Sequence, residues 1–282
     1  MMAAERGAAA NTLAAYERDL RQANTIPGGL AAADETQLRS LAEDWRELAS
    51  STVARKISSL RQFFGFLVDE GLRSDDPSAA LTRPATRRPL PKILSVDEVV
   101  RLLQQAEGEA SSERPAAVRT LVLLELLYGS GLRASELVSL PFNAVPRDAP
   151  FLSVTGKGGL MRMVPVSSKA QAALSRWLAL RPDDPRYLFP SRTGHLTRVR
   201  LFQLLKALAT RADLPADEVG PHVLRHAFAT HLLAGGADLR VLQMLLGHAD
   251  ISTTQIYTHV DAARLVQLVN ERHPLAARAA VD

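Results

Sequence analysis

A set of cationic side chains and one hydroxyl in the second half of the chain could hold a phosphodiester and attack it. Two arginines, a lysine and two histidines supply charge or exchange protons, and a tyrosine supplies the hydroxyl; these residues are Arg133, Arg225, Lys157, His222, His248 and Tyr257. Guanidinium groups bind phosphate through paired hydrogen bonds, and an activated hydroxyl can act as a nucleophile. Such a set would neutralise the charge that develops on the phosphate without a metal ion.

The spacing of these residues predicts the elements that position them. His222 and Arg225 are three residues apart, so on a helix they share a face and can meet one phosphate. Arg133 follows the turn-like sequence GSG and leads into a predicted helix at 134–139. Lys157 lies in a glycine-rich turn between two β-rich runs, which predicts a hairpin with this lysine at its tip.

Several of these side chains also have an ordinary structural interpretation. An isolated tyrosine on an amphipathic helix is most often a core residue whose hydroxyl finds a partner, and the arginines could form surface ion pairs. His226 and His231 follow His222 at spacings of four and nine residues, and an HxxxH pair can bind zinc. No cysteine, no HExxH glutamate and no third ligand at a clear spacing supports a metal site. We therefore expect His226 and His231 to pack or to form hydrogen bonds.

Four stretches of the chain carry a resemblance to a known family. They are DDPSAAL (75–81), GLRASELVSL (131–140), GKGGLMRMVPV (156–166) and the long block PHVLRHAFATHLLAGGADLRVLQMLLGHADISTTQIYTHV (221–260). The chain resembles the tyrosine recombinases of the phage integrase family, within them the Xer subgroup, and within that the XerD type. The resemblance runs from Asn11 to Pro274.

The resemblance implies a role for each member of the set. Tyr257 would attack the DNA and form a 3′-phosphotyrosine bond, while Arg133 and Arg225 would bind the non-bridging oxygens of the scissile phosphate. Lys157 would act as the general acid toward the leaving 5′-oxygen. His222 would assist proton transfer from the tyrosine, a role that suits a group titrating near neutrality.

The resemblance also implies the partners. The enzyme would be a site-specific recombinase that resolves chromosome dimers at a dif-like DNA site, in a tetramer with a XerC-type recombinase and under control of a DNA translocase of the FtsK kind. His248 would hydrogen-bond the phosphate. No ATP, metal or other cofactor would be needed, because the number and type of bonds are preserved. In the family the last helix docks on a neighbouring protomer, and an apolar stripe would serve that purpose here: Ala262, Leu265, Leu268 and Val269.

The chain divides around a basic, proline-rich connector. The sequence LTRPATRRPLPK (81–92) carries three prolines and four basic residues, so neither helix nor strand continues through it. We predict an N-terminal helical domain that binds core DNA at 1–81, a linker at 82–91 and a C-terminal catalytic domain at 92–282. The predicted fold is mainly α with a small antiparallel β-sheet in the catalytic domain, arranged as a two-domain DNA clamp.

Hydrophobic periodicity and capping residues predict the individual elements. Helices are expected at 11–23, 34–48, 51–71, 95–106, 116–128, 134–139, 168–180, 197–212, 222–235, 238–246, 252–258 and 261–271. The two β-rich runs predict the hairpin at 151–166. The polar face of the helix at 51–71 carries four candidates for DNA contacts: Arg55, Lys56, Arg61 and Gln62.

Composition narrows the class of protein. The 282 residues include 34 Lys+Arg and 30 Asp+Glu, a formal charge of +4, which permits a DNA partner without demanding one. The absence of cysteine excludes disulfides and thiol catalysis. No apolar run reaches the ~18–20 residues of a membrane span, and the N-terminus has no signal peptide, so we expect a cytoplasmic protein.

Family members carry a further helix before Asn11, so we expect the natural start to lie upstream.

Three alternatives share part of this pattern. A phage- or integron-type integrase uses the same chemistry on another DNA target, but the XerD-like sequence and the absence of an extra arm-binding domain argue against it. A type IB topoisomerase activity would relax supercoils with the same residues. A DNA-binding module without catalysis would not need the complete set of catalytic residues that the chain retains.

Overall fold

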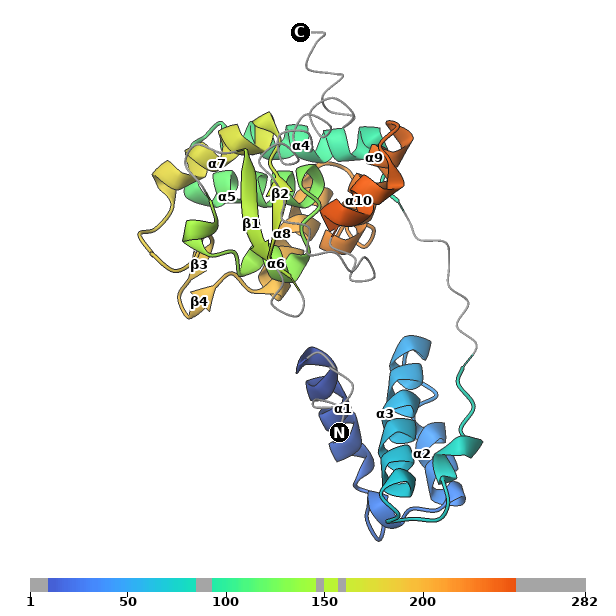
Figure 1. The fold of residues 1–282 in the computed structure, drawn as a ribbon. Coiled ribbons are helices and arrows are strands. Elements are labelled where there is room, and N and C mark those ends of the chain that lie inside the picture. The colour runs from blue at the N-terminus through green and yellow to red at the C-terminus, as the bar shows by residue number, and fades with distance from the viewer. Residues whose placement is uncertain (1–9, 85–92, 146–149, 157–160, 247–282) are drawn as a thin grey trace. The chain divides into compact units, whose positions relative to one another are not determined.

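The computed structural model of the protein describes four stretches of the chain: residues 10–84, 93–145, 150–156 and 161–246. They belong to two compact units, Met1–Pro91 (unit 1) and Lys92–Asp282 (unit 2), each of which is described by itself (Figure 1). The predicted fold class, mainly α with small antiparallel sheets, is confirmed. None of the helices in these stretches has the length and apolar character that crossing a membrane requires.

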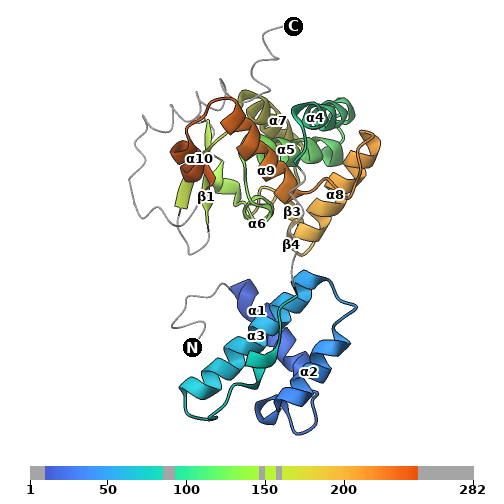
Figure 2. The same ribbon diagram turned by 90° about the vertical axis from the view of Figure 1, so that its right-hand side faces the viewer.

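Unit 1 has its core along one long helix. Its described elements are α1 (Ala10–Ala23), η1 (Leu30–Ala32), α2 (Glu35–Asp44), α3 (Ser50–Asp69) and η2 (Pro77–Ala80). Ile57, Leu60 and Phe64 recur every three to four residues along α3 and are at most 1% exposed. Helix α1 packs against this long helix (Figure 2). The helix predicted at 34–48 ends early, because the chain turns at Trp45, whose ring is buried.

Unit 2 is organised around α5. Its described helices are α4 (Val96–Ala110), α5 (Pro115–Gly129), α6 (Ala134–Val138), η3 (Phe142–Ala144), α7 (Ser168–Leu180), α8 (Arg198–Arg211), α9 (Pro221–Ala234) and α10 (Leu239–Leu246). Every residue from Leu121 to Gly129 is buried, because α5 is apolar around most of its circumference and α4, α7 and α9 pack against it. The helices that carry the candidate site residues are therefore fixed to one core.

The described part of unit 2 also contains two antiparallel strand pairs. They are β1 (Phe151–Thr155) with β2 (Met161–Pro165), and β3 (Pro190–Ser191) with β4 (Gly194–His195). In the first pair Phe151 lies opposite Pro165 and Thr155 lies opposite Met161, which confirms the predicted hairpin. The second pair was not predicted, because strands of two residues leave no periodic signal in a sequence.

Candidate active site

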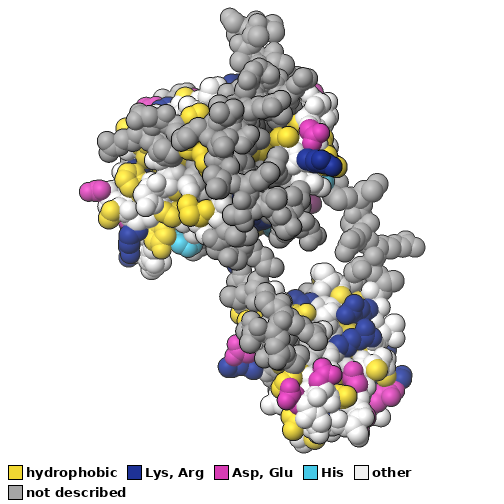
Figure 3. Space-filling model, viewed as in Figure 1, with side chains coloured by type: hydrophobic (Ala, Val, Ile, Leu, Met, Phe, Trp, Pro, Cys, Tyr) yellow, Lys and Arg dark blue, Asp and Glu magenta, His cyan; other side chains and the backbone are white. Residues whose placement is uncertain are grey.

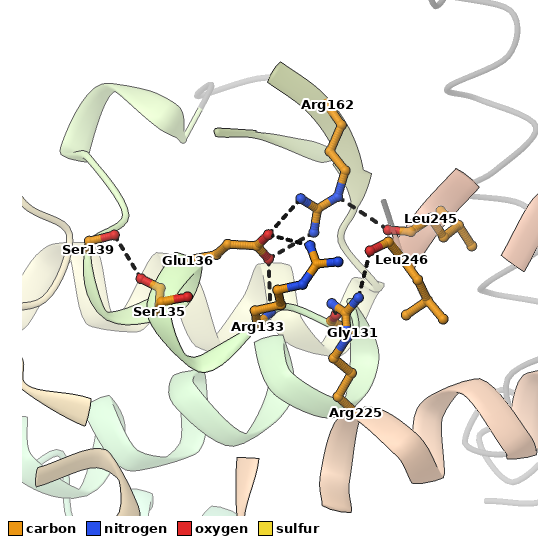
Figure 4. A network of polar contacts seen from close by, with 9 residues as sticks. All are labelled: Gly131, Arg133, Ser135, Glu136, Ser139, Arg162, Arg225, Leu245 and Leu246. Atoms are coloured by element: carbon orange, nitrogen blue, oxygen red, sulfur yellow. Dashed lines mark hydrogen bonds and ion pairs between the residues drawn. The ribbon is translucent and has the colours of Figure 1, made fainter. Parts of the chain in front are cut away.

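Arg133 is the residue before the first turn of α6, and Glu136 fixes it there (Figure 4). The backbone nitrogen of Arg133 donates to Glu136 Oε2 at 2.9 Å, and its Nη1 donates to Glu136 Oε1 at 2.8 Å. The side chain of Glu136 is 5% exposed, whereas that of Arg133 is 34% exposed. A buried carboxylate thus holds the guanidinium of Arg133 in place, while part of the Arg133 side chain stays accessible to a phosphate.

Arg225 comes from α9 and lies in the same group of polar contacts (Figure 4). Its Nη2 donates to the carbonyl oxygen of Leu246 at 2.6 Å, and its Nη1 donates to the carbonyl oxygen of Gly131. Burial, followed by the charge of Arg133, lowers the pKa of Arg225 to about 10, so the group remains a cation at neutral pH. A guanidinium has five N–H donors, and these two bonds use two of them.

Gly131 is what allows α9 to come this close. Its φ is +61°, a conformation that L side chains rarely adopt, and an added Cβ would lie 2.5 Å from Cδ1 and 2.6 Å from Cε1 of Phe228. Phe228 is on α9 and is fully buried. The turn before Arg133 therefore packs directly on the helix of Arg225, which brings the two arginines into one site.

The sequence interpretation missed a third arginine of this site. Nη1 and Nη2 of Arg162, on β2, each donate to one oxygen of Glu136 at 2.8 Å, and its Nε donates to the carbonyl oxygen of Leu245 at 3.3 Å (Figure 4). The signal was present in the sequence: Arg162 and Val164 are two residues apart in a β-rich run, so they lie on the same face of β2. That face is buried. An arginine on the core-facing side of a strand needs a carboxylate partner.

The surroundings of Glu136 favour the ionised form of its carboxyl group. Burial acts to raise its pKa, but hydrogen bonds from Arg162 and from the Arg133 backbone, together with attraction to the Arg162 charge, lower the pKa from an ordinary 4.5 to about 2. A folded-state pKa below the unfolded value stabilises the protein above the unfolded pKa, and this stabilisation is lost as the pH falls toward the folded pKa. The loss therefore occurs between pH 4.5 and pH 2.

We predict that Glu136→Gln flattens the acid limb of the stability curve of unit 2. The wild type should lose on the order of 3 kcal/mol between pH 5 and pH 2 through this group, a contribution that the variant no longer has. Urea unfolding followed by the fluorescence of Trp177 would measure it in a Trp45→Phe background, since the chain has two tryptophans. Glu107→Gln, at an exposed pair with Arg176, is the control. Equal acid losses in wild type and Glu136→Gln would refute this linkage.

Of the other predicted site residues, the structure describes His222 but not the remaining three. His222 lies in the first turn of α9, exposed and three residues before Arg225, as the helical spacing requires. Lys157, His248 and Tyr257 lie outside the described residues. The strands on either side of the lysine are described, and their pairing ends with Thr155 opposite Met161.

His231 has a structural role at the other end of α9. It is 7% exposed, and its Nδ1 lies 3.0 Å from the hydroxyl oxygen of Tyr128 on α5. The imidazole also hydrogen-bonds with the backbone of Leu94, and burial lowers the pKa of His231. The expectation that His231 forms hydrogen bonds is confirmed, whereas His226 is exposed. Within the described residues no group of His, Cys, Asp and Glu side chains is placed to hold a metal ion.

Lys56, one of the four candidates for DNA contacts on α3, is buried in unit 1. It is 5% exposed, its Nζ donates to Oε1 of Gln22 at 2.6 Å, and the same Nζ lies 3.5 Å from Oδ1 of Asp19. Both partners are on α1. Lys56 therefore holds α3 against α1, and its ammonium is not presented to solvent.

The other three candidates retain some surface. Arg55 pairs with the buried Asp19, yet its side chain is 37% exposed. Arg61 donates from Nη2 to the carbonyl oxygen of Leu81 at 2.8 Å and, like Gln62, is partly exposed. On the face of unit 1 that Figure 3 shows, Lys and Arg side chains lie among Asp and Glu side chains. Small groups of basic residues, with acidic residues close by, are what this face offers to an anionic partner.

Two family profiles cover most of the chain. The Phage integrase family matches residues 92–264, and the Phage integrase N-terminal SAM-like domain matches residues 1–71. A tyrosine recombinase XerC of Erythrobacter litoralis (strain HTCC2594) is 72% identical over 280 residues, covering 99% of this chain and 92% of the relative. A tyrosine recombinase XerD of Brucella suis biovar 1 is 52% identical over 294 residues, covering 98% and 95%. The Xer subgroup is confirmed, but the XerD type is not settled, since the XerC relative is the more similar of these two.

Solved structures agree with the fold. The XerH site-specific recombinase bound to difH substrate is 26% identical, with a TM-score of 0.63 over 91% of this chain and 76% of that chain. The Tn1549 transposon integrase in complex with a circular intermediate DNA has a TM-score of 0.70 over 99% of this chain and 95% of that chain, and at 18% identity it shows the fold alone. From the profiles and the relatives, the chain belongs to the phage integrase family and is a tyrosine recombinase, an enzyme that breaks and rejoins DNA strands at specific sites.

Proposed function

We propose that the protein resolves chromosome dimers at a dif-like DNA site, as the XerD-type member of a pair of recombinases. The proposal depends on the similarity to relatives named XerC and XerD, which covers at least 98% of this chain. The XerH structure with its difH substrate supports a dif-like duplex as the target. The partners are a XerC-type recombinase and an FtsK-type translocase, and chromosomal DNA as substrate puts the protein in the cytoplasm. The 72% identity to a XerC favours the XerC-type role as the second candidate.

In the proposed reaction, Arg133 and Arg225 bind the non-bridging oxygens of the scissile phosphate and stabilise the charge of the transition state. Their anchoring supports this role, because Glu136 and two backbone carbonyls fix the guanidinium groups before DNA arrives. Groups fixed in advance pay no reorganisation cost at the moment of reaction. His248 hydrogen-bonds the same phosphate.

The covalent step exchanges one phosphodiester bond for another. The Tyr257 oxygen attacks phosphorus with assistance from His222, and the bond from phosphorus to the 5′-oxygen breaks as Lys157 donates a proton to that oxygen. A 5′-hydroxyl from the partner duplex then attacks the phosphotyrosine and releases the tyrosine. The number and type of bonds are preserved in this exchange, so the reaction consumes no cofactor.

Unit 1 serves as the second half of the DNA grip in this proposal. Arg55, Arg61 and Gln62 are its candidates for phosphate or groove contacts, since each keeps part of its surface exposed on α3. Arg55 keeps the most direct access, because its side chain is 37% exposed despite the pair with Asp19. Lys56 supports these contacts by fixing α3 on α1.

A suicide substrate tests the proposed target. A duplex with a candidate dif site of the same genome, nicked beside the cleavage position, releases a short fragment on cleavage and so traps the covalent intermediate. We expect an adduct on a denaturing gel with the XerC-type partner present, and a higher yield when the FtsK-type translocase is added. Labelling each strand separately shows which half-site this protein cleaves and thus decides between the XerD-type and XerC-type roles.

Two other outcomes would assign a different function. Cleavage at the ends of a mobile element, with no adduct at the dif-like site, would make the protein an integrase. Relaxation of a supercoiled plasmid that lacks any recombination site would indicate a type IB topoisomerase activity.

A further inference from the structure

Arg162, on β2, contacts two other elements of the site, α6 and α10. It lies on β2, which follows the turn that contains Lys157, and it binds Glu136 on α6, the helix that Arg133 opens. Its Nε donates to the carbonyl oxygen of Leu245, near the end of α10. The side chain is 8% exposed, so it does not face solvent and acts through its neighbours (Figure 4).

The contacts of Glu136 show what Arg162 does for Arg133. Each carboxylate oxygen of Glu136 accepts one hydrogen bond from Arg162 and one from Arg133, the latter from the side chain at Oε1 and the backbone at Oε2. Two arginines thus share one negative charge. If Arg162 were absent, a buried carboxylate would be left with Arg133 as its charged partner in this network. Glu136 would then compete with the DNA phosphate for Arg133.

The second contact of Arg162 acts on the end of α10. Arg162 binds the carbonyl of Leu245 and Arg225 binds the carbonyl of Leu246, so two cations satisfy consecutive carbonyl groups at the C-terminus of this helix. The last carbonyls of a helix lack intrahelical partners, and cations are favoured there. Beyond this point the chain runs on to His248 and Tyr257.

We propose that Arg162 is a positioning residue for DNA cleavage: it takes up the charge of Glu136 so that Arg133 stays available to the phosphate, and it fixes the end of α10 from which the chain leads to Tyr257. The inference rests on the proposed function of Arg133 and Arg225 as the phosphate clamp. It assigns no contact between Arg162 and DNA.

The first test separates binding from cleavage. Arg162→Gln should form the covalent adduct on the nicked dif-like substrate about 100-fold more slowly than wild type, a loss typical of a misplaced charge-stabilising group. Its affinity for the same DNA in a gel-shift assay should change by no more than about 3-fold, because the residue is buried. Wild-type cleavage by Arg162→Gln, or a loss of binding as large as the loss of cleavage, would overturn the proposal.

A double variant tests the competition itself. In Glu136→Gln/Arg162→Gln the competing carboxylate is gone, so adduct formation should be about 10-fold faster than in Arg162→Gln alone. A residue that only held the fold together would give a double variant as slow as the single one or slower, and that result would count against the proposal. Arg162→Lys, which keeps the charge but loses the bidentate geometry, should lie between wild type and Arg162→Gln. It also serves if Arg162→Gln does not fold.

The matched control is Arg176→Gln. Arg176 likewise makes two bonds to carboxylates and one to a backbone carbonyl, but with Glu107, Glu113 and Ala110, away from Arg133 and Arg225. It should cleave at the wild-type rate.

A DNA-independent arm uses inorganic phosphate as the probe. The rise in melting temperature that phosphate gives wild type and Arg176→Gln should shrink in Arg162→Gln and return in the double variant. Equal rises in all four proteins would overturn the proposal. If wild type forms no adduct at the dif-like site, the proposed target fails, while this arm still decides the role of Arg162.

Discussion

Tyr257→Phe should bind its DNA site and never become covalently joined to it. The substitution removes one oxygen atom and keeps the ring, so the side chain stays nearly the same size while the proposed nucleophile is lost. Loss of a nucleophile that forms a covalent intermediate typically slows a reaction by about 10⁴-fold or more. On the nicked dif-like substrate the adduct should fall below detection, while the gel-shift affinity stays within about 2-fold of wild type.

Another tyrosine of unit 2 supplies the control. Tyr187 is partly exposed and packs edge-on against His195 at a centroid distance of 5.2 Å. Tyr187→Phe makes the same chemical change outside the network of Arg133, Arg162 and Arg225, and it should form the adduct at the wild-type rate. An adduct formed by Tyr257→Phe would sink the assignment of the nucleophile, whereas equal loss in both variants would point to damage to the fold.

Gly131→Ala should destabilise unit 2 and disable the site together. The positive φ alone costs about 1–2 kcal/mol for an L side chain. The new Cβ would also overlap the ring of Phe228, which is fully buried and therefore has no room to move away. Overpacking of this kind costs a further 1–3 kcal/mol or so, for a total of roughly 3 kcal/mol. A shift of the turn would also move the Gly131 carbonyl oxygen, which accepts a hydrogen bond from Arg225. It would displace Arg133 as well, because Arg133 follows Gly131 by two residues.

The measurement is urea unfolding of unit 2, followed by the fluorescence of Trp177 in the Trp45→Phe background, combined with adduct formation on the nicked substrate. Gly108→Ala is the control, because Gly108 lies inside α4 and an added Cβ would meet no atom within 4 Å. That change should stabilise the helix by about 0.5–1 kcal/mol and leave cleavage intact. If Gly131→Ala is as stable as wild type, the close packing of the turn on α9 does not exist in solution.

Local pattern was enough to predict much of unit 2. The helices at 168–180, 197–212 and 222–235 are found within one residue at each end, as Ser168–Leu180, Arg198–Arg211 and Pro221–Ala234. The hairpin at 151–166 is found as well. These elements have strong periodic or alternating patterns, which survive tertiary packing.

Contacts between distant segments could not be predicted in the same way. The pair of Arg162 with Glu136 joins residues 26 apart in sequence, and helical spacing shows only neighbours three or four residues away. Lys56 was assigned to a polar face, but Asp19 of α1 makes that position an interior one. Lys157, His248 and Tyr257 stay predictions of sequence alone. The motif ADLRVLQMLLGH pointed to XerD, and a single motif was too little to separate XerD from XerC.

The hydrogen bonds of His231 have a mechanical consequence. Leu94 is 3% exposed and stands just after the connector, where the described chain of unit 2 begins. Its backbone is tied to His231, which is in turn tied to Tyr128 on the central helix α5. The start of unit 2 is therefore linked to α9, the helix that also carries His222 and Arg225. A displacement of the chain where unit 2 begins would therefore disturb α9, the helix that holds Arg225, through a single imidazole.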